Sequence, residues 1–222
     1  MSADILTNIR LIHLIIDPQE GYLPILSGKA RVAEYLNELR NFSDALYDFN
    51  IPTLIVGCNE RRSLRKFEFY TTPDAIQSAA TRLRIAFPMR DGEHLFEKGD
   101  ENGFKEPFLE LYMRSLGVSG FILSGGHTYP CVGATKTGGI EAGFQCYAIP
   151  DLMFEGMANT ATMEFSAERN QRLLSYNAFD KTKLSFHARE EFLNLLKEKP
   201  APPAKMAPAY GNRRAQLATA VF

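Results

Sequence analysis

The sequence contains no tryptophan, only three cysteines and no long apolar run. An odd number of cysteines without paired spacing excludes a disulfide framework and a CxxC-type zinc site, and it is typical of a reducing, intracellular compartment. The first apolar run, Leu11–Ile16, is too short for a secretory signal, and no window approaches the roughly 18 apolar residues of a membrane span. We therefore expect a cytoplasmic protein that is not inserted in a membrane.

An excess of charge of either sign is also missing. The 25 Lys and Arg residues are balanced by 26 Asp and Glu residues, which gives a formal net charge of -1 at pH 7. A general electrostatic attraction to nucleic acid or to an anionic membrane is therefore absent. We expect neither of these as a partner.

The length of 222 residues suits a single domain with a tail. From Lys199 onward prolines alternate with alanines, and the basic residues meet no acidic residue. This composition predicts a domain over residues 1–198 and an extended tail over residues 199–222. A neighbouring subunit would give the terminal Val221-Phe222 a surface on which to bury, so we expect a homo-oligomer, dimer or tetramer. A loose tail is the alternative.

Short apolar runs that predict strands alternate with stretches of helical periodicity. The predicted strands are Leu11–Ile16, Thr53–Cys58, His94–Lys98, Gly120–Ser124, Gln145–Pro150 and Leu184–Phe186. The predicted helices cover residues 27–50, 107–116, 132–142, 158–175 and 188–196, and another starts near Pro73. This alternation predicts an α/β fold, namely a doubly wound, mainly parallel sheet of about six strands with helices on both faces. Ligands of such folds bind at the carboxyl ends of the strands.

Cys131 is the strongest candidate for chemistry. It follows a predicted strand and two glycines, where a helix is expected to begin. Backbone N–H groups and the positive end of the helix dipole would favour a thiolate there and would stabilise an oxyanion. The alternative is a small buried apolar residue, which is the expectation for Cys58 and Cys146 inside their strand runs.

Three motifs, in this order, resemble a known family. They are LIIDPQ at 14–19, Glu97-Lys98 followed by Gly103-Phe104, and the stretch from Gly117-Val118 through SGGHTYPCV at 124–132 to Ala142-Gly143-Phe144. Over residues 10–196 the chain resembles the isochorismatase-like cysteine hydrolase superfamily, which includes nicotinamidases and N-carbamoylsarcosine amidases. The resemblance implies the isochorismatase-like fold and a hydrolase that cleaves a C–N bond of a small amide-type substrate.

The resemblance further implies a catalytic triad of Asp17, Lys98 and Cys131. Asp17 would take the thiol proton, Lys98 would hold that carboxylate ionised, and Cys131 would attack a carbonyl to form a thioester. It also implies an oxyanion site made by backbone N–H groups of His127 and Cys131, on a turn with a cis peptide between Gly126 and His127.

The departures from the family pattern concern metal and substrate. Nicotinamidases carry metal-binding Asp and His residues after the second strand, where this chain has GCNERR at 57–62, so we expect no metal and no cofactor. Arg61 and Arg62 are interpreted as an anion-binding pair or, alternatively, as a solvated edge or subunit contact. True isochorismatases lack the cysteine, which argues against that activity here.

Three further residues are assigned to the substrate pocket: Tyr22, Gln19 and Tyr129. Gln19 is equally interpreted as a partner of Asp17 or a loop residue. His127 lies four residues before Cys131, but Pro130 argues against a helix there, so a Cys–His dyad is not expected. An idle family member kept as a binding or scaffold protein is the alternative function.

Overall fold

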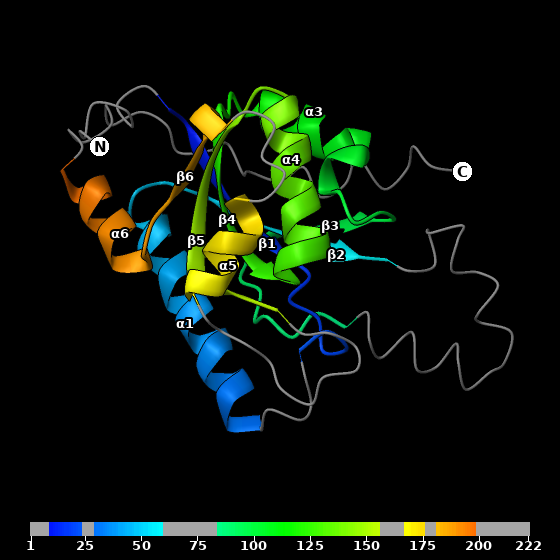
Figure 1. The fold of residues 1–222 in the computed structure, drawn as a ribbon, viewed down its shortest axis with the longest axis vertical. Coiled ribbons are helices and arrows are strands. Elements are labelled where there is room, and N and C mark those ends of the chain that lie inside the picture. The colour runs from blue at the N-terminus through cyan, green and yellow to red at the C-terminus, as the bar shows by residue number, and fades with distance from the viewer. Residues whose placement is uncertain (1–8, 24–28, 60–83, 156–166, 176–180, 199–222) are drawn as a thin grey trace, which may run out of the picture.

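The computed structural model describes residues 9–23, 29–59, 84–155, 167–175 and 181–198 (Figure 1). Several predictions fall outside these ranges. They concern the tail 199–222, the pair Arg61 and Arg62, and the helix starts at Ser27 and Pro73.

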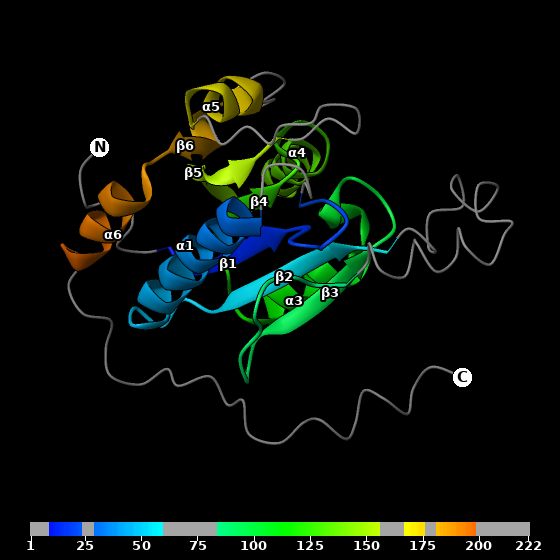
Figure 2. The same ribbon diagram turned by 90° about the horizontal axis from the view of Figure 1, so that it is seen from below.

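Six parallel strands form a single sheet in the order β3-β2-β1-β4-β5-β6. Their bounds are β1 Leu11–Ile16, β2 Thr53–Cys58, β3 His94–Lys98, β4 Gly120–Gly126, β5 Gln145–Phe154 and β6 Leu184–Phe186. Figure 2 shows β3 and β2 at one side of the twisted sheet, with β1 and β4 next to them. The strand order reverses between β1 and β4, which makes the sheet doubly wound and places a binding crevice at their carboxyl ends. The predicted fold class is confirmed.

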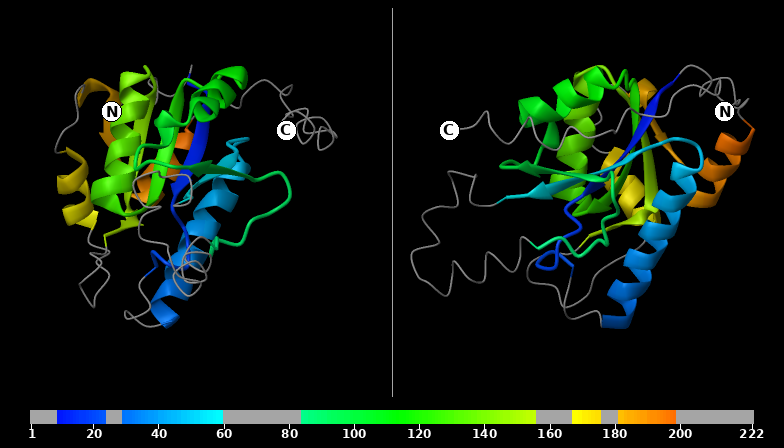
Figure 3. Two further views of the ribbon diagram at one scale, coloured as in Figure 1. Left: turned by 90° about the vertical axis from the view of Figure 1, so that its right-hand side faces the viewer. Right: turned by 180° about the vertical axis from the view of Figure 1, so that it is seen from behind.

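Helices cover both faces of the sheet. On one face lie α1 (Lys29–Tyr47) and α6 (Arg189–Lys197), and on the other α3 (Pro107–Ser115), α4 (Gly133–Glu141) and α5 (Ala167–Ser175). In both views of Figure 3, α1 lies on the opposite side of the sheet from α4. Side chains along β1 alternate between the two cores, with Leu11 and Ile15 on the α1 face and Ile12 and Leu14 on the other. This is why β1 is apolar at every position except His13.

The segment around Cys131 differs from the prediction. Residues Thr128–Val132 form one π-helical turn that leads into α4, and Val132 N donates to His127 O at 3.0 Å. The expectation that Pro130 excludes a helix here is wrong, because the first turn of a helix leaves its N–H groups without helical partners and proline loses nothing there. The other predicted elements that are described occur within a few residues of their expected bounds, apart from β5, which continues to Phe154. Of the predicted helix 158–175, only α5, Ala167–Ser175, lies within the described residues.

His13 is fully buried in β1 and has partners on both ring nitrogens, as expected for a core histidine. Ser43 Oγ donates its proton to Leu39 O at 3.0 Å, so it can only accept from His13 Nδ1 at 3.3 Å. His13 Nε2 then accepts from Ser124 Oγ at 2.8 Å. Burial, aided by the positive charge of Arg40, lowers the pKa of His13 to about 3. The ring is neutral and ties β1 to β4 beneath the crevice.

No helix among the described residues has the length and apolar character needed to cross a membrane.

Candidate active site

Three of the predicted site residues meet at the carboxyl edge of the sheet. Asp17 directly follows β1, Lys98 ends β3, and Cys131 lies in the turn after β4. Asp17 has φ +48°, a left-handed conformation that turns the chain sharply out of the strand. Since β2 separates β1 from β3, the Lys98 side chain has to reach across β2 to meet Asp17. Its Nζ lies 2.9 Å from Asp17 Oδ2, and both side chains are at most 1% exposed.

Lys98 is held as an ammonium ion by three acceptors. Besides Asp17 Oδ2, its Nζ donates to Asp100 O and Glu101 O, each at 3.2 Å. Burial alone lowers the pKa of Lys98, but the Asp17 carboxylate, aided by the Cys131 and Cys58 thiols, outweighs it and holds the pKa above the ordinary value. Lys98 therefore stays charged and supplies the positive charge of the site.

Asp17 has the properties of a proton acceptor. Burial raises the pKa of its carboxyl group, while the charge of Lys98, the neighbouring Cys131 thiol and the Cys58 backbone act in the opposite direction. Both carboxylate oxygens are buried without a well-directed hydrogen bond. A carboxylate with a raised pKa and unused lone pairs, next to a thiol, is suited to accept that thiol's proton.

The Cys131 side chain is half-buried and lies beside the Asp17 carboxylate, so the two groups shift each other's pKa. Burial and then the Asp17 charge raise the pKa of the thiol, and Lys98 only partly offsets them. This direction is opposite to the effect expected from the helix start, which would favour the thiolate. The thiol is enclosed beside a carboxylate, and the ionised sulfur would lie next to another negative charge. The resting pair is a neutral thiol and a carboxylate.

Two glycines shape the turn that carries Cys131. Gly125 has φ +102°, and a Cβ there would overlap the backbone of Ile16 on the neighbouring strand. A Cβ on Gly126 would overlap the Phe154 ring. The peptide bond between Gly126 and His127 is cis, as the resemblance implies. The glycines let β4 end directly against β1, which brings Cys131 to Asp17.

Glu155 at the end of β5 is a site residue that the sequence analysis missed. It is 8% exposed, and its Oε2 accepts from Tyr129 N at 2.7 Å. Because that N–H is used and Pro130 has none, neither can serve an oxyanion. The oxyanion role expected for the backbone of His127 and Cys131 is compatible with this geometry and stays a prediction.

The three residues predicted to line the substrate pocket lie in three different environments. The Tyr22 ring lies edge-on to His127 at 5.7 Å, beside the turn that precedes Cys131. Gln19 is 1% exposed, and its side-chain amide binds both backbone groups of Cys58. Gln19 Nε2 donates to Cys58 O at 3.0 Å, and Gln19 Oε1 accepts from Cys58 N at 2.8 Å. Gln19 thus holds the end of β2 against the loop after β1, and its placement among the pocket residues stays a prediction.

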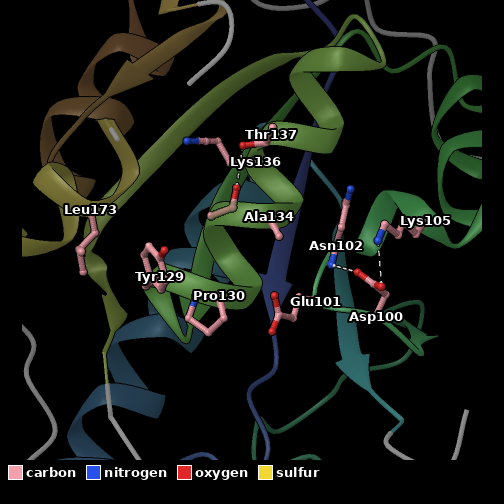
Figure 4. Close-up of a pocket in the computed structure, with 11 residues that line it drawn as sticks. Asp100, Glu101, Asn102, Lys105, Tyr129, Pro130, Ala134, Lys136, Thr137 and Leu173 are labelled. Carbon is pink, nitrogen blue, oxygen red and sulfur yellow. Dashed lines mark hydrogen bonds and ion pairs between the residues drawn. The ribbon is translucent and has the colours of Figure 1, made fainter. Parts of the chain in front are cut away.

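Tyr129 is 59% exposed and lies on the other side of the turn. With Pro130 it lines an open groove of about 460 Å³ along α4, opposite Glu101 and Asn102 (Figure 4). None of the three residues Asp17, Lys98 and Cys131 lines this groove. Tyr129 therefore faces the groove beside the site.

Among the described residues no three His, Cys, Asp or Glu side chains are grouped closely enough to hold a metal ion. Most of the segment in which the family pattern places its metal ligands lies outside those residues, because only Gly57, Cys58 and Asn59 of residues 57–62 are described. Metal independence stays a prediction.

Comparisons with known proteins bear on the family and the fold of the chain. The family model described as "Isochorismatase domain" matches residues 12–166. A search of curated proteins gives no match. Solved structures do match, all at low sequence identity, so they bear on the fold alone.

A cysteine hydrolase from Pseudomonas syringae pv. phaseolicola 1448A superposes with a TM-score of 0.64 at 15% identity, covering 85% of this chain and 92% of that one. An isochorismatase family protein from Burkholderia thailandensis gives a TM-score of 0.64 at 14% identity, with 85% and 96% covered. An isochorismatase from Pseudomonas putida KT2440 gives 0.59 at 19% identity, with 82% and 89% covered.

Proposed function

The chain belongs to the isochorismatase domain family and has its hydrolase fold, and from that premise we propose that it is a metal-independent cysteine hydrolase that cleaves a C–N bond of a small amide. The observation that carries the proposal is the buried Asp17–Lys98 ion pair with the Cys131 thiol beside the same carboxylate. Burying a charged pair costs desolvation free energy. The thiol beside it fills space that the side chain of alanine or serine would fill equally well, so packing does not explain the cysteine.

The first half of the reaction uses the resting proton arrangement. Asp17 removes the proton from Cys131 as the thiolate attacks the substrate carbonyl carbon, and a C–S bond forms. Lys98 stabilises the negative charge, which moves from carboxylate to sulfur and then to the carbonyl oxygen. As the tetrahedral intermediate collapses, the C–N bond breaks and Asp17 returns its proton to the leaving nitrogen. Ammonia or an amine departs and leaves a thioester on Cys131.

The second half consumes water. Asp17, ionised again, takes a proton from a water molecule as the oxygen attacks the thioester carbonyl. The C–S bond breaks, the carboxylic acid leaves, and the proton on Asp17 passes back to the Cys131 sulfur. The balance is one amide and one water giving one acid and one amine, with the enzyme restored.

The substrate is proposed to be a small molecule that approaches the turn between Gly126 and Cys131. Tyr22 supplies an aromatic edge there through its contact with His127. We further propose that the protein works as a homo-oligomer, as the apolar end of residues 199–222 suggests.

A hydrolase screen tests the proposal, with small amides, carbamoyl compounds and nicotinamide as substrates and release of ammonia or amine as the readout. Wild type and Cys146→Ala, a buried cysteine of β5, should both turn over at least one substrate, whereas Cys131→Ala should not. Mass spectrometry of stopped reactions should show an acyl group on the peptide containing Cys131. Turnover that survives in Cys131→Ala would refute the mechanism, and binding without turnover by any variant would favour the idle scaffold.

A further inference from the structure

The loop that follows Lys98 is packed against the helix that follows Cys131. We propose that Thr135 in α4 is a positioning residue, which fastens the loop that holds Lys98 to the helix that carries Cys131. The inference rests on the proposed function only because that function makes Lys98 and Cys131 act together in one reaction. The contacts themselves are properties of the fold.

The position of Lys98 depends on the shape of its own loop. Two of the three acceptors of its ammonium group are the backbone oxygens of Asp100 and Glu101. Bonds within the loop give it a fixed form, with Asn102 N to Asp100 Oδ1 at 3.0 Å and Phe104 N to Asn102 Oδ1 at 2.9 Å. These bonds shape the loop, but they do not set its distance from the helix that carries the thiol.

The hydroxyl group of Thr135 makes that connection. It accepts from Gly103 N at 3.0 Å and donates to Glu101 O at 3.4 Å. One hydroxyl can do both, because it has a proton to donate and lone pairs to accept with. The Glu101 oxygen therefore contacts Lys98 Nζ and Thr135 Oγ1 together. A continuous path of polar contacts runs from the Lys98 ammonium to α4, four residues beyond Cys131.

The interface around Thr135 is closely packed. Thr135 is 0% exposed. A Cβ on Gly138 would overlap the Asn102 amide, and one on Gly139 would come within 2.8 Å of the Phe104 ring. The small residues of α4 thus let the loop come close to the helix. Loss of the Thr135 hydroxyl would leave the N–H of Gly103 without this partner.

Loss of the hydroxyl would let the loop move and carry Lys98 with it. Lys98 is the group that opposes the two influences, burial and Asp17, that keep Cys131 protonated. A displaced ammonium ion would therefore weaken thiolate formation at Cys131 even though neither residue has been changed. A role in stability alone would not alter the chemistry of the thiol in molecules that remain folded.

The test compares Thr135→Val, which keeps the shape but removes the hydroxyl, with Thr135→Ser, which restores it. The readout is the rate of iodoacetamide alkylation of Cys131 across a pH series, followed by peptide mass mapping on protein shown to be folded by circular dichroism. We expect Thr135→Val to react about 10-fold more slowly at neutral pH, with a profile displaced by about one unit toward alkaline pH. Thr135→Ser should follow the wild type.

Thr137→Val is the matched control. Thr137 lies in the same helix, and its hydroxyl donates only to Gly133 O, within the helix, at 3.1 Å. The Thr137→Val substitution should leave the pH profile of Cys131 alkylation unchanged. If Thr135→Val does not fold, Thr135→Ala takes its place, since it also lacks the hydroxyl and leaves a gap rather than a crowded methyl group.

A wild-type profile in the variants without the hydroxyl would overturn the proposal, and so would an equal displacement in Thr135→Ser or Thr137→Val. The readout requires no substrate, so the outcome is separate from the hydrolase screen. A displaced profile in a protein that hydrolyses nothing would keep the positioning role and remove the proposed function.

Discussion

Replacing Asp17 by asparagine should have opposite effects on two properties of Cys131. Asp17 is the proposed acceptor of the thiol proton, so its loss should lower hydrolysis by about 10²- to 10⁴-fold, the usual contribution of a general base. The same carboxylate is a cause of the raised pKa of the Cys131 thiol, whereas Lys98 lowers it. In Asp17→Asn the negative neighbour is gone, so the thiol should ionise more readily and react faster with iodoacetamide.

The size of the gain follows from the charge that is removed. A unit charge about 4 Å away contributes about 4 kcal/mol at an effective dielectric constant of 20. A third of that value corresponds to one pKa unit, or a tenfold larger thiolate fraction at neutral pH. We therefore expect alkylation of Cys131 to be at least about 10-fold faster in the variant. The variant should also be less stable by about 3 to 5 kcal/mol, because Lys98 is left buried without its counter-charge.

The assay measures both rates on one preparation, with urea unfolding as the check on stability. The buried Cys146 of β5 serves as the internal reference, since it should label in neither protein until the chain unfolds. Parallel loss of alkylation and hydrolysis would refute the reasoning, because it would mean that Asp17 promotes the resting thiolate. Unchanged hydrolysis would remove Asp17 from the mechanism altogether.

Three further predictions concern metal, assembly and acid stability. Hydrolysis should survive exhaustive treatment with EDTA, and an activity lost on chelation but restored by zinc or manganese would place a metal in the reaction. Deleting residues 200–222 should weaken a homo-oligomer in light scattering, and an unchanged assembly would exclude the tail from the contact. His13 has a folded pKa of about 3 against 6.5 when unfolded, so acid favours the unfolded chain, which alone binds the proton. The free energy of unfolding should fall by about 2 kcal/mol more between pH 6.5 and pH 5 than in His13→Gln, and equal falls would contradict the buried neutral ring.

The strands of this fold could be predicted because a parallel sheet covered on both faces demands uninterrupted apolar runs. β1 contributes side chains to both cores and is apolar at every position except His13. The end of β5 could not be predicted in this way, since Pro150 and Asp151 interrupt its apolar pattern. The pairing of β5 with β4 shifts register between Leu123 and Gly125, and the strand then continues to Phe154. A register shift depends on the neighbouring strand and leaves no local signal.

The three residues at the strand ends were predictable for the same topological reason, combined with the motifs around them. Their partners were not. Glu155 hydrogen-bonds to the backbone of Tyr129, which lies 26 positions away in the sequence. Thr135 hydrogen-bonds to the backbone of Gly103, which lies 32 positions away. Nothing in the residues around Glu155 or Thr135 distinguishes them from other polar residues at a strand end or in a helix. The effect of packing on the Cys131 pKa was likewise hidden, because enclosure of the thiol depends on the whole crevice.

The protonation of the resting site explains why a lysine is needed beside an aspartate and a cysteine. With Asp17 ionised, Cys131 neutral and Lys98 an ammonium ion, the three groups carry no net charge. A buried cluster without net charge has the smallest desolvation cost. Transfer of the thiol proton to Asp17 keeps that total at zero and only moves the negative charge from oxygen to sulfur. Lys98 faces both groups, so it compensates the charge before and after the transfer. The nucleophile thus needs no preformed thiolate, because the proton passes to the neighbouring Asp17 carboxylate at the moment of attack.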